Sequence, residues 1–361
     1  MTGSQASHPL APWAALLSRL LPAVLLPAVL LLGGCSRERP AYQEQGYVFG
    51  TLVEVTVYGE PDARARQAVA AVMHEFQRLH DMLHAWKPSE LTDLNSALAQ
   101  GHPRQVTPEL TAILADAKQL SDQSGGLFDP AIGRLIQAWG FQADEFKPVL
   151  PDAKQIAALV QEHPQMDDLV LAGDTVSSRN RAVQLDLGGY AKGYALDRAA
   201  ALLKQMGVHD ALINIGGNVL ALGAHGDRPW RVGIQHPRKP GPLATLELHD
   251  GEAIGTSGDY QRFFEVAGKR YCHLIDPRTG WPVQGVQAVT IITRGARAGV
   301  RSDADSKPLF VSGVQGWRAA ARTMGLEEAL LVDGDGRVHL TPAMQKKLDF
   351  TDKSTVTEVE P

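Results

Sequence analysis

The chain has 361 residues, of which 44% are hydrophobic and 21% are charged, and its formal net charge is −5. This composition is typical of a globular protein. Its acidic balance gives no sign of the basic face that nucleic-acid binding usually needs, so we expect no nucleic-acid partner. The two cysteines, Cys35 and Cys272, are too few for a disulfide framework.

The first predicted element is a lipoprotein signal peptide over residues 1–34. Its apolar run, residues 20–32, is too short to span a bilayer comfortably and contains Pro22 and Pro27. The run ends in LGGC, which resembles the bacterial lipobox, so we expect the mature chain to begin at Cys35 and this cysteine to carry the lipid. The expected location is periplasmic, anchored to the bacterial membrane, the inner more than the outer. An ordinary secretory signal followed by an unrelated cysteine is the alternative.

The next segments lead into a folded domain, predicted over residues 47–341. Residues 35–46 are polar and aperiodic, which predicts a tether between lipid and domain. Residues 47–59 alternate well enough to form a strand pair or one long strand. Further on, Thr107 before Pro108 predicts the cap and the first residue of a helix.

The second half of the domain mixes strand and helix patterns. The segments expected there are short strands over residues 169–187, an amphipathic helix over 191–206, a buried strand over 211–223 that ends on glycines, and a hairpin over 328–341. Residues 342–361 form a polar C-terminal tail, which we expect to fray. No repeat or clean linker divides the domain, so we predict one α+β domain, organised as one body or as two lobes.

The segment LDLGGYAKGYALD places a glycine pair between a predicted strand that ends at Asp186 and the predicted helix. Gly188 and Gly189 bring backbone N–H groups to a helix N-terminus, which is an anion-binding position. Lys192 adds a positive charge in the first turn, where the helix dipole disfavours it, which indicates a bound anion. The pattern matches neither the dinucleotide nor the P-loop signature, so a simple strand-to-helix turn is the alternative.

Two later segments carry residues with chemical potential. His273 precedes the loop DPRTG and is a candidate acid or base, with a structural histidine as the alternative. Asp303 and Asp305 lie close together with neighbouring hydroxyls, which fits either the ligation of a hard cation or a helix N-cap.

Taken in order, the motifs FGT, SGGLFDPAIG, WGF, LDLGGYAKGYALD, NIGGN, GTSGDY, HLIDPRTG and DADSKPLFVSG resemble those of the ApbE family, the FAD:protein FMN transferases. The resemblance covers about residues 45–340. It implies an α+β flavin-transferase fold that binds FAD and Mg²⁺, transfers FMN through a phosphoester to a threonine or serine of a partner protein, and releases AMP. The implied acceptors are membrane redox subunits with a short Asp-x-x-Ser/Thr-Gly-Ala-Ser/Thr motif. The lipobox is consistent with the family, because many members are periplasmic lipoproteins.

The resemblance also implies roles for individual residues. His273 is the implied catalytic residue, and the metal positions are Gly189 through its carbonyl, Asp303 and Lys307. The implied FAD contacts are Phe49, Trp86, Leu127, Phe128, Asp129, Asp186, Lys192 and Ile275. Lys307 stands where the family often has a threonine ligand, and a protonated lysine cannot ligate a metal. We therefore expect either a metal shell completed by backbone carbonyls and phosphate, or a contact from Lys307 to phosphate.

Two other functions are compatible with these residues. The same site could use water as the acceptor and split FAD into FMN and AMP. Alternatively, the chain is a non-enzymatic lipoprotein that binds FAD, a possibility that Lys307 keeps open.

Overall fold

The structure is a computed structural model that describes residues 41–360. The predicted signal peptide and Cys35 lie outside the described residues. Those that are described belong to one unit, with no division into two lobes. Within them, every helix is either too short or too polar to cross a membrane.

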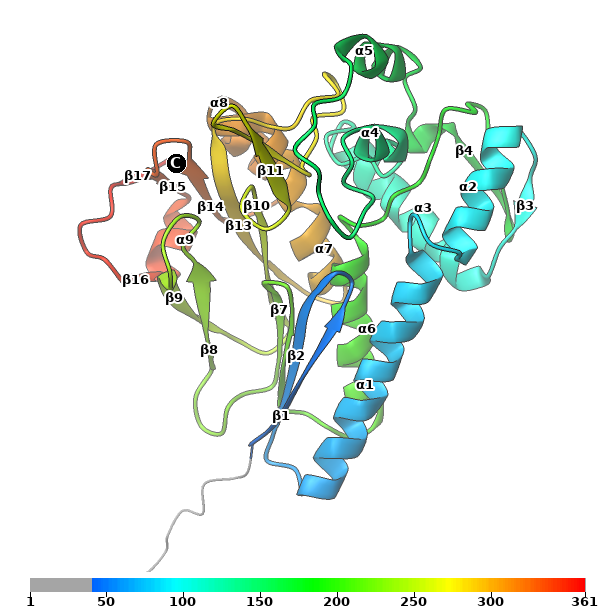
Figure 1. The fold of residues 1–361 in the computed structure, drawn as a ribbon. Helices are drawn as coiled ribbons and strands as arrows, with labels where there is room; N and C mark the ends of the chain where they lie inside the picture. Colours follow the sequence, from blue (N-terminus) through cyan, green and yellow to red (C-terminus); the bar gives the residue numbers. More distant parts are fainter. Residues whose placement is uncertain (1–40, 361) are drawn as a thin grey trace, which may run out of the picture. The chain divides into compact units, whose positions relative to one another are not determined.

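A nine-stranded sheet forms the centre of this unit (Figure 1). Its strands in spatial order are β1 (Ala41–Val48), β2 (Thr51–Tyr58), β6 (Ala211–Ile215), β7 (Asn218–Leu222), β10 (Glu252–Gly258), β13 (Val286–Arg294), β14 (Glu328–Asp333), β15 (Val338–Leu340) and β17 (Thr357–Val359). Neighbouring strands are antiparallel except for β15 and β17, which are parallel. The prediction of an α+β fold is confirmed.

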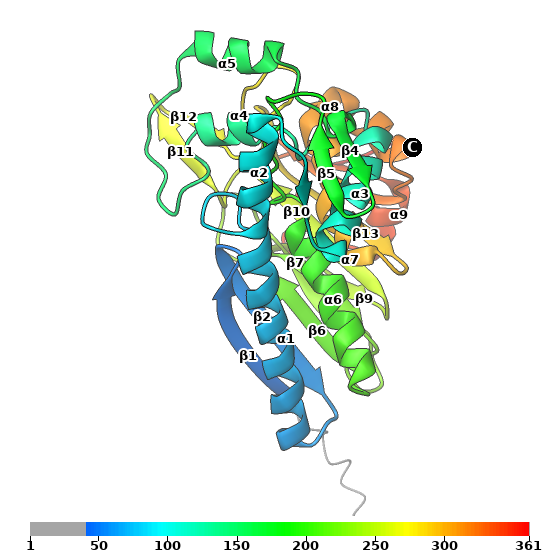
Figure 2. The same cartoon turned by 90° about the vertical axis from the view of Figure 1, so that its right-hand side faces the viewer.

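Helices α1 (Asp62–Leu83) and α6 (Ala191–Gln205) run side by side over one end of the sheet (Figure 2). Strand β2, beneath these helices, has the alternating burial of a half-buried strand. Val53, Val55 and Val57 are buried, while the residues between them are not. The two helices bury apolar residues that recur every three or four positions, such as Val69 and Val72. The sequence period therefore determines which side of each helix faces the sheet.

Two further layers complete the core. Helix α8 (Ser306–Thr323) belongs to a cluster in which Phe310 and Trp317 pack with Val289 and Leu331 of the sheet, while the preceding helix α7 (Ala298–Ala304) packs Val300 and Ala304 into a different cluster. The small sheet made of β8 (Trp230–Gln235), β9 (Pro242–Leu248) and β16 (Asp349–Phe350), with α9 (Pro342–Lys347), contributes to a separate apolar cluster with strands of the central sheet.

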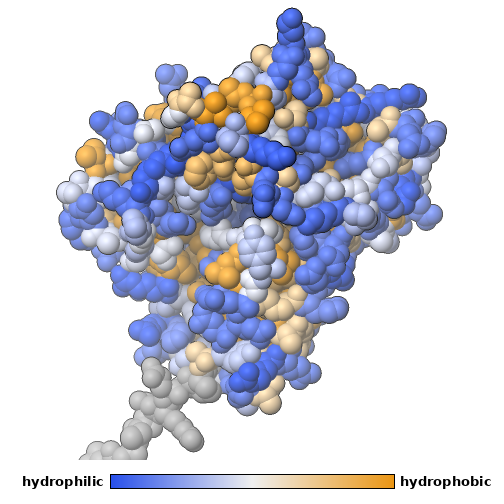
Figure 3. Space-filling view, in the orientation of Figure 1, coloured by the Kyte–Doolittle hydropathy of each residue, from blue (hydrophilic) through white to orange (hydrophobic). Residues whose placement is uncertain are grey.

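The remaining elements gather beyond one end of the central sheet. They are α2 (Glu90–Gln100), α3 (Pro108–Gln123), α4 (Gly133–Ala138), α5 (Ala153–Gln161), the 3-10 helix η1 (Met166–Asp168), the sheet β3 (Arg104–Gln105), β4 (Leu169–Ala172) and β5 (Thr175–Ser178), and the hairpin β11 (Phe263–Val266) and β12 (Lys269–Cys272). Trp139 ties the hairpin to α4, because its ring stacks on Tyr271 and its Nε1 donates to the Gly280 carbonyl at 2.7 Å. On the face seen in Figure 3, hydrophobic residues form separate patches among polar ones.

Several predicted elements are confirmed, and four details are corrected. The helix after Thr107, the helix from Ala191 and the final hairpin occur as expected. The tether is shorter, because β1 begins at Ala41 and pairs with β2 over its whole length. Residues 211–223 form two strands around a glycine turn rather than one. Residues 185–187 are extended but not a strand, with only Gln184 forming an isolated bridge.

The C-terminal tail is ordered rather than frayed. Thr341 caps α9 by accepting a hydrogen bond from the Met344 N–H, and β17 adds to the edge of the central sheet. Glu360 then reaches His339 and Trp317 through its side chain. The charged residues of this segment therefore belong to an exposed edge strand, β17, where charges protect the sheet edge from pairing with other chains.

Candidate active site

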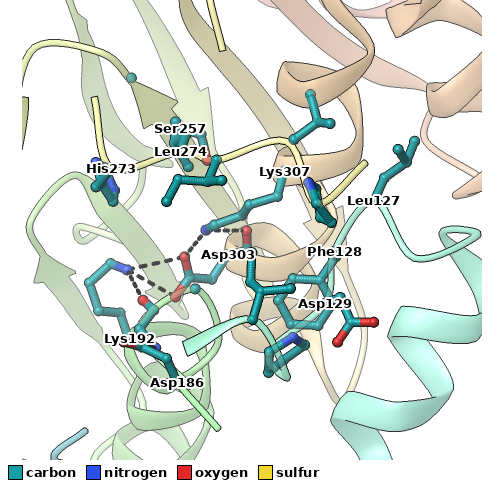
Figure 4. A pocket seen from close by; sticks show the side chains of 18 of the residues that line it. Leu127, Phe128, Asp129, Asp186, Lys192, Ser257, His273, Leu274, Asp303 and Lys307 are labelled. Carbon is teal, nitrogen blue, oxygen red and sulfur yellow. Dashed lines mark hydrogen bonds and ion pairs between the residues drawn. The ribbon is translucent and has the colours of Figure 1, made fainter. Parts of the chain in front are cut away.

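One pocket collects most of the residues singled out by the sequence (Figure 4). Its walls come from the segment between α3 and α4, the glycine pair before α6, the end of β10, the segment after β12, and the start of α8. Of the predicted site residues it includes Leu127, Phe128, Asp129, Asp186, Gly189, Lys192, His273, Ile275, Asp303 and Lys307. About 120 Å³ of free space remains in it. Pockets for small molecules are usually several times larger, so only part of a dinucleotide would fit in this conformation.

Asp303 is the centre of the pocket's charge. It lies in α7 with its side chain 1% exposed, and its Oδ2 accepts a hydrogen bond from the Gly193 N–H at 3.1 Å. The Lys192 ammonium contacts both carboxylate oxygens at 3.2 Å and donates to the Gly188 carbonyl at 3.0 Å. Burial alone would raise the pKa of Asp303, but the ammonium groups of Lys192 and Lys307 outweigh it and hold that pKa well below its usual range.

Lys307 reaches the same carboxylate from the first turn of α8. Its Nζ donates to Asp303 Oδ1 and, at 2.6 Å, to the backbone oxygen of Asp303. Figure 4 shows the two lysines approaching Asp303 from different sides. Burial lowers the pKa of Lys307 to about 8, although the negative charge of Asp303 opposes this. The pocket floor therefore carries two ammonium groups against one carboxylate.

A close approach of two helices positions this group. A Cβ atom added at Gly193 would lie 2.3 Å from the Gly299 carbonyl oxygen and 2.8 Å from Asp303 Cβ. Only glycine lets α6 and α7 come this near, which is why the sequence KG opens the helix. Asp197 accepts hydrogen bonds from the N–H groups of Gly299 and Val300 and so caps α7. Lys192, at the start of α6, and Asp303, near the end of α7, are thereby held by two helices that fix each other.

The arrangement does not fit the predicted Mg²⁺ site at Gly189, Asp303 and Lys307. Mg²⁺ needs free, deprotonated oxygen ligands at about 2.0–2.1 Å in octahedral geometry. Here both carboxylate oxygens and the backbone oxygen of Asp303 already accept hydrogen bonds from ammonium groups. Residues 41–360 contain no cluster of three or more histidine, cysteine, aspartate or glutamate side chains that could hold a metal ion. We therefore derive no chemistry from a metal at Asp303.

His273 lies directly after β12, at the wall of the pocket. Its Nδ1 is 3.2 Å from the Arg262 backbone oxygen, which can only accept, so Nδ1 carries the proton. No group among the described residues bonds Nε2, which leaves this nitrogen as a free acceptor. Burial, together with the charges of Arg262 and Lys192, lowers the pKa of His273 to about 3, so the ring is neutral near pH 7. A neutral ring can accept a proton, although a pKa this far below 7 makes His273 a weak base in the unliganded site.

The two other predicted carboxylates have structural duties. The Asp186 carboxylate accepts hydrogen bonds from the Gly188 N–H at 2.9 Å and from Gln142 Nε2 at 2.8 Å. It therefore fixes the turn at Gly188 and the position of the Gln142 side chain. Asp129 turns its carboxylate away from the pocket, to the N–H groups of Ala131 and Met166. Burial raises the pKa of Asp129 to about 6. Asp129 therefore lines the pocket through its backbone and positions the segment that carries Leu127 and Phe128.

Phe49 and Trp86, both predicted FAD contacts, lie outside the pocket lining. Phe49 forms the β1–β2 turn with a φ of 56°, and its ring contacts that of His80. Trp86 contacts the ring of His84, and the Arg262 guanidinium lies 5.8 Å from its ring centroid. Since the Arg262 carbonyl also bonds His273, this arginine links the aromatic group to the pocket.

The structure adds residues that sequence reasoning missed. Gln142 holds Asp186, and Ser257 contacts Ser306, whose hydroxyl donates to the Asp303 backbone oxygen at 2.7 Å. The motif GTSGDY contains Ser257, so that segment carried a signal. Gln142 and the Arg262 side chain had none, because the hydrogen bonds of Gln142 to Asp186 and of the Arg262 guanidinium to the Phe141 carbonyl join segments more than 40 residues apart in the chain.

Two partly buried lysine side chains, a neutral imidazole with a free acceptor nitrogen and a half-enclosed pocket define a protein that acts on an anionic ligand. A model described as the ApbE family matches residues 49–331 of the chain. The chain belongs to the ApbE family.

Individual relatives agree with this assignment. A Rhodobacter capsulatus protein named FAD:protein FMN transferase is 43% identical over 328 residues, which are 90% of this chain and 62% of that relative. A Treponema pallidum protein of the same name is 33% identical and is covered over 93% of its length, against 90% of this chain. The crystal structure of the Thermotoga maritima ApbE protein superposes with a TM-score of 0.78 at 29% identity, covering 85% of this chain and 99% of that one.

Proposed function

We propose that the chain transfers FMN from FAD to a serine or threonine hydroxyl of an acceptor protein and releases AMP. The observation that carries this proposal is the convergence of the neutral His273 ring with the ammonium groups of Lys192 and Lys307 in one pocket. The pocket thus offers a base and positive charge together. The two relatives described above are named FAD:protein FMN transferases, which supports the same reaction.

The reaction is an in-line displacement at phosphorus. The acceptor oxygen forms a bond to the FMN phosphorus, and the bond from that phosphorus to the bridging oxygen of the pyrophosphate breaks. AMP leaves with the bridging oxygen, and the acceptor hydroxyl loses its proton. Positioning and charge stabilisation supply most of the rate in such transfers, so the protein's task is to fix both reactants and to take the proton.

His273 is the proposed proton acceptor. Its Nε2 has no partner among residues 41–360, and its Nδ1–H is held by the Arg262 carbonyl. Nε2 is therefore the nitrogen available to accept the proton. The ring cannot rotate without losing the hydrogen bond from Nδ1 to the Arg262 carbonyl. General-base assistance of this kind contributes about 10²–10⁴-fold to a rate.

Lys192 and Lys307 are the proposed contacts for the pyrophosphate, because ammonium groups bind phosphate oxygens as point charges. Leu127, Phe128 and Ile275 form apolar walls beside them. We propose that the isoalloxazine ring extends towards Phe49 and Trp86, beyond the small pocket. Arg262 stands between these two regions and would lie beside the flavin.

We further propose the setting that the sequence predicts: a lipid on Cys35, a periplasmic location, and a membrane redox subunit with the motif Asp-x-x-Ser/Thr-Gly-Ala-Ser/Thr as acceptor. Mass spectrometry of the purified full-length protein would detect the lipid on an N-terminal Cys35. An unmodified cysteine, or cleavage elsewhere, would contradict the anchor without bearing on the activity.

The activity is tested with FAD and an acceptor domain carrying that motif. Transfer produces a covalent, fluorescent flavin band on the acceptor and one AMP per flavin, and replacement of the acceptor hydroxyl by alanine abolishes the band. AMP and free FMN formed without acceptor would indicate hydrolysis instead. FAD retained with no AMP at all would indicate a binding protein.

A further inference from the structure

Lys307 occupies the place at which a cation would meet Asp303. Its Nζ contacts both the carboxylate and the backbone oxygen of that residue, and its side chain is only 14% exposed. The lysine stem passes close over Gly189, since a Cβ added there would lie 3.1 Å from Lys307 Cε. The glycine leaves the room that the lysine stem uses.

Lys192 donates hydrogen bonds to the other oxygens around Asp303. It contacts both Asp303 carboxylate oxygens and the Gly188 carbonyl, while the Gly193 N–H also donates to Asp303 Oδ2. Asp303 is thus surrounded by donors on every described side. A divalent cation placed on it would displace an ammonium group and would be repelled by the other, because like charges at such distances in a buried site interact strongly.

We propose that the Lys307 ammonium is a built-in cation of this site, which takes the place of a divalent metal at Asp303 and neutralises the pyrophosphate of FAD itself. The inference rests on the proposed function. Asp303 then serves to orient the two ammonium groups rather than to ligate a metal. Around Asp303 itself, two lysines less one carboxylate leave one net positive charge for a pyrophosphate, without any ion taken from solution.

The hydrogen-bond donors of Lys307 support this assignment over a site that combines the lysine with a metal ion. Phosphate binding by lysine needs no fixed coordination geometry, because the ammonium offers three donors on a flexible stem. Lys307 spends two of its donors on Asp303, which leaves one for a phosphate oxygen. The chain therefore has the donor that a metal-free site needs and lacks the open oxygen ligands that a metal needs.

The first test measures metal binding without FAD. Mn²⁺ takes oxygen ligands as Mg²⁺ does, and its free concentration can be followed by electron paramagnetic resonance during titration of the full-length protein. Wild type is expected to show no saturable site that depends on Asp303. Lys307→Thr removes the ammonium and offers a hydroxyl oxygen, so it should gain a saturable Mn²⁺ site that the further change Asp303→Asn abolishes.

The exposed Lys239, outside the pocket lining, supplies the matched control, and Lys239→Thr should behave as wild type. A saturable Mn²⁺ site in wild type that Asp303→Asn removes would overturn the inference. Should Lys307→Thr fail to fold by circular dichroism, Lys307→Met keeps the stem without the charge. Lys307→Met should weaken FAD binding in EDTA by about ten-fold, and an unchanged FAD affinity would also overturn the inference.

The second test measures transfer in EDTA. Wild type should retain transfer after chelation, and Lys307→Thr should transfer only with added Mg²⁺. Loss of wild-type transfer in EDTA with recovery on adding Mg²⁺ would contradict the built-in cation. Absence of transfer under both conditions would count against the proposed function instead, and the Mn²⁺ titration would then decide the inference by itself.

Discussion

The Nδ1 atom of His273 lies 3.2 Å from the backbone oxygen of Arg262, and this contact determines which ring nitrogen is free. His273→Ala should keep FAD affinity within about two-fold and reduce FMN transfer by at least about 10²-fold, because only the proton acceptor is lost. Fluorescence titration of FAD and the flavin-band assay measure the two quantities. His249→Ala, at an exposed position, is the control. Normal transfer by His273→Ala would show that another group takes the proton.

The same residue predicts an unusual pH dependence. Burial and neighbouring positive charge lower the pKa of His273 to about 3, so the ring stays neutral down to about pH 4. The single-turnover rate should therefore show no acid limb centred near pH 6.5, the ordinary histidine value. A profile between pH 5 and pH 8 checks this. A wild-type rate that falls towards acid pH with a midpoint of pH 6 to 7 would mean that the ring titrates as if it were exposed.

Asp303 should matter for stability as well as for activity. Asp303→Asn leaves the partly buried ammonium groups of Lys192 and Lys307 without their counter-charge, and removing one partner of a buried pair costs up to about 3–5 kcal/mol. Urea denaturation measures the free energy of unfolding. Adding Lys307→Met should restore part of the loss, since one unpaired charge disappears. Equal losses in the single and double variants would argue against direct coupling.

Asp129 should make stability depend on pH with the sign of a raised carboxyl pKa. Burial raises its pKa to about 6, above the value of about 3.9 in an unfolded chain. The folded chain thus holds this proton more tightly, and the stabilisation is present below pH 4 and lost as the pH rises through 6. The free energy of unfolding of wild type relative to Asp129→Asn should therefore fall by roughly 2 kcal/mol from pH 4 to pH 7. Glu145→Gln, at an exposed position, should show no such difference.

The ordered C-terminus gives a prediction remote from the pocket. Glu360 Oε1 accepts from Trp317 Nε1 at 3.2 Å and lies 3.0 Å from His339 Nδ1, and both partners are buried. Glu360→Ala leaves two buried polar groups unsatisfied and should cost about 1–3 kcal/mol of stability. FMN transfer at 25 °C should stay within two-fold of wild type. Thermal denaturation and the flavin-band assay distinguish this outcome from a frayed terminus, which would change neither quantity.

Elements with a strong local signal could be predicted, while contacts between distant segments could not. The cap Thr107 and the apolar period of α6 are local, and both predictions are confirmed. β17 could not be recognised, because its three exposed residues show no alternation of polar and apolar side chains. It forms a strand only by pairing with β15.

The candidate site divides in the same way. Motif order identified the residues that line the pocket, including His273, Asp303 and Lys307. It could not show that Asp129 turns its carboxylate to Met166, since that contact joins separate loops. Nor could the lysine at position 307 reveal by itself that its Nζ reaches Asp303, because the geometry of the junction between α7 and α8 decides this.

The early start of β1 limits which acceptors the proposed enzyme could serve. If Cys35 is the lipidated residue, residues 36–40 alone join it to the strand, and five extended residues reach at most about 18 Å. The eight residues of β1 then carry the chain about 26 Å further to the turn at Phe49 and Gly50, which lies beside Arg262, where we propose that the flavin binds. An acceptor hydroxyl would therefore have to come within the reach that this short connection allows from the bilayer. Proteins anchored in the same membrane would meet the enzyme there repeatedly, whereas a freely diffusing protein would gain no such local concentration.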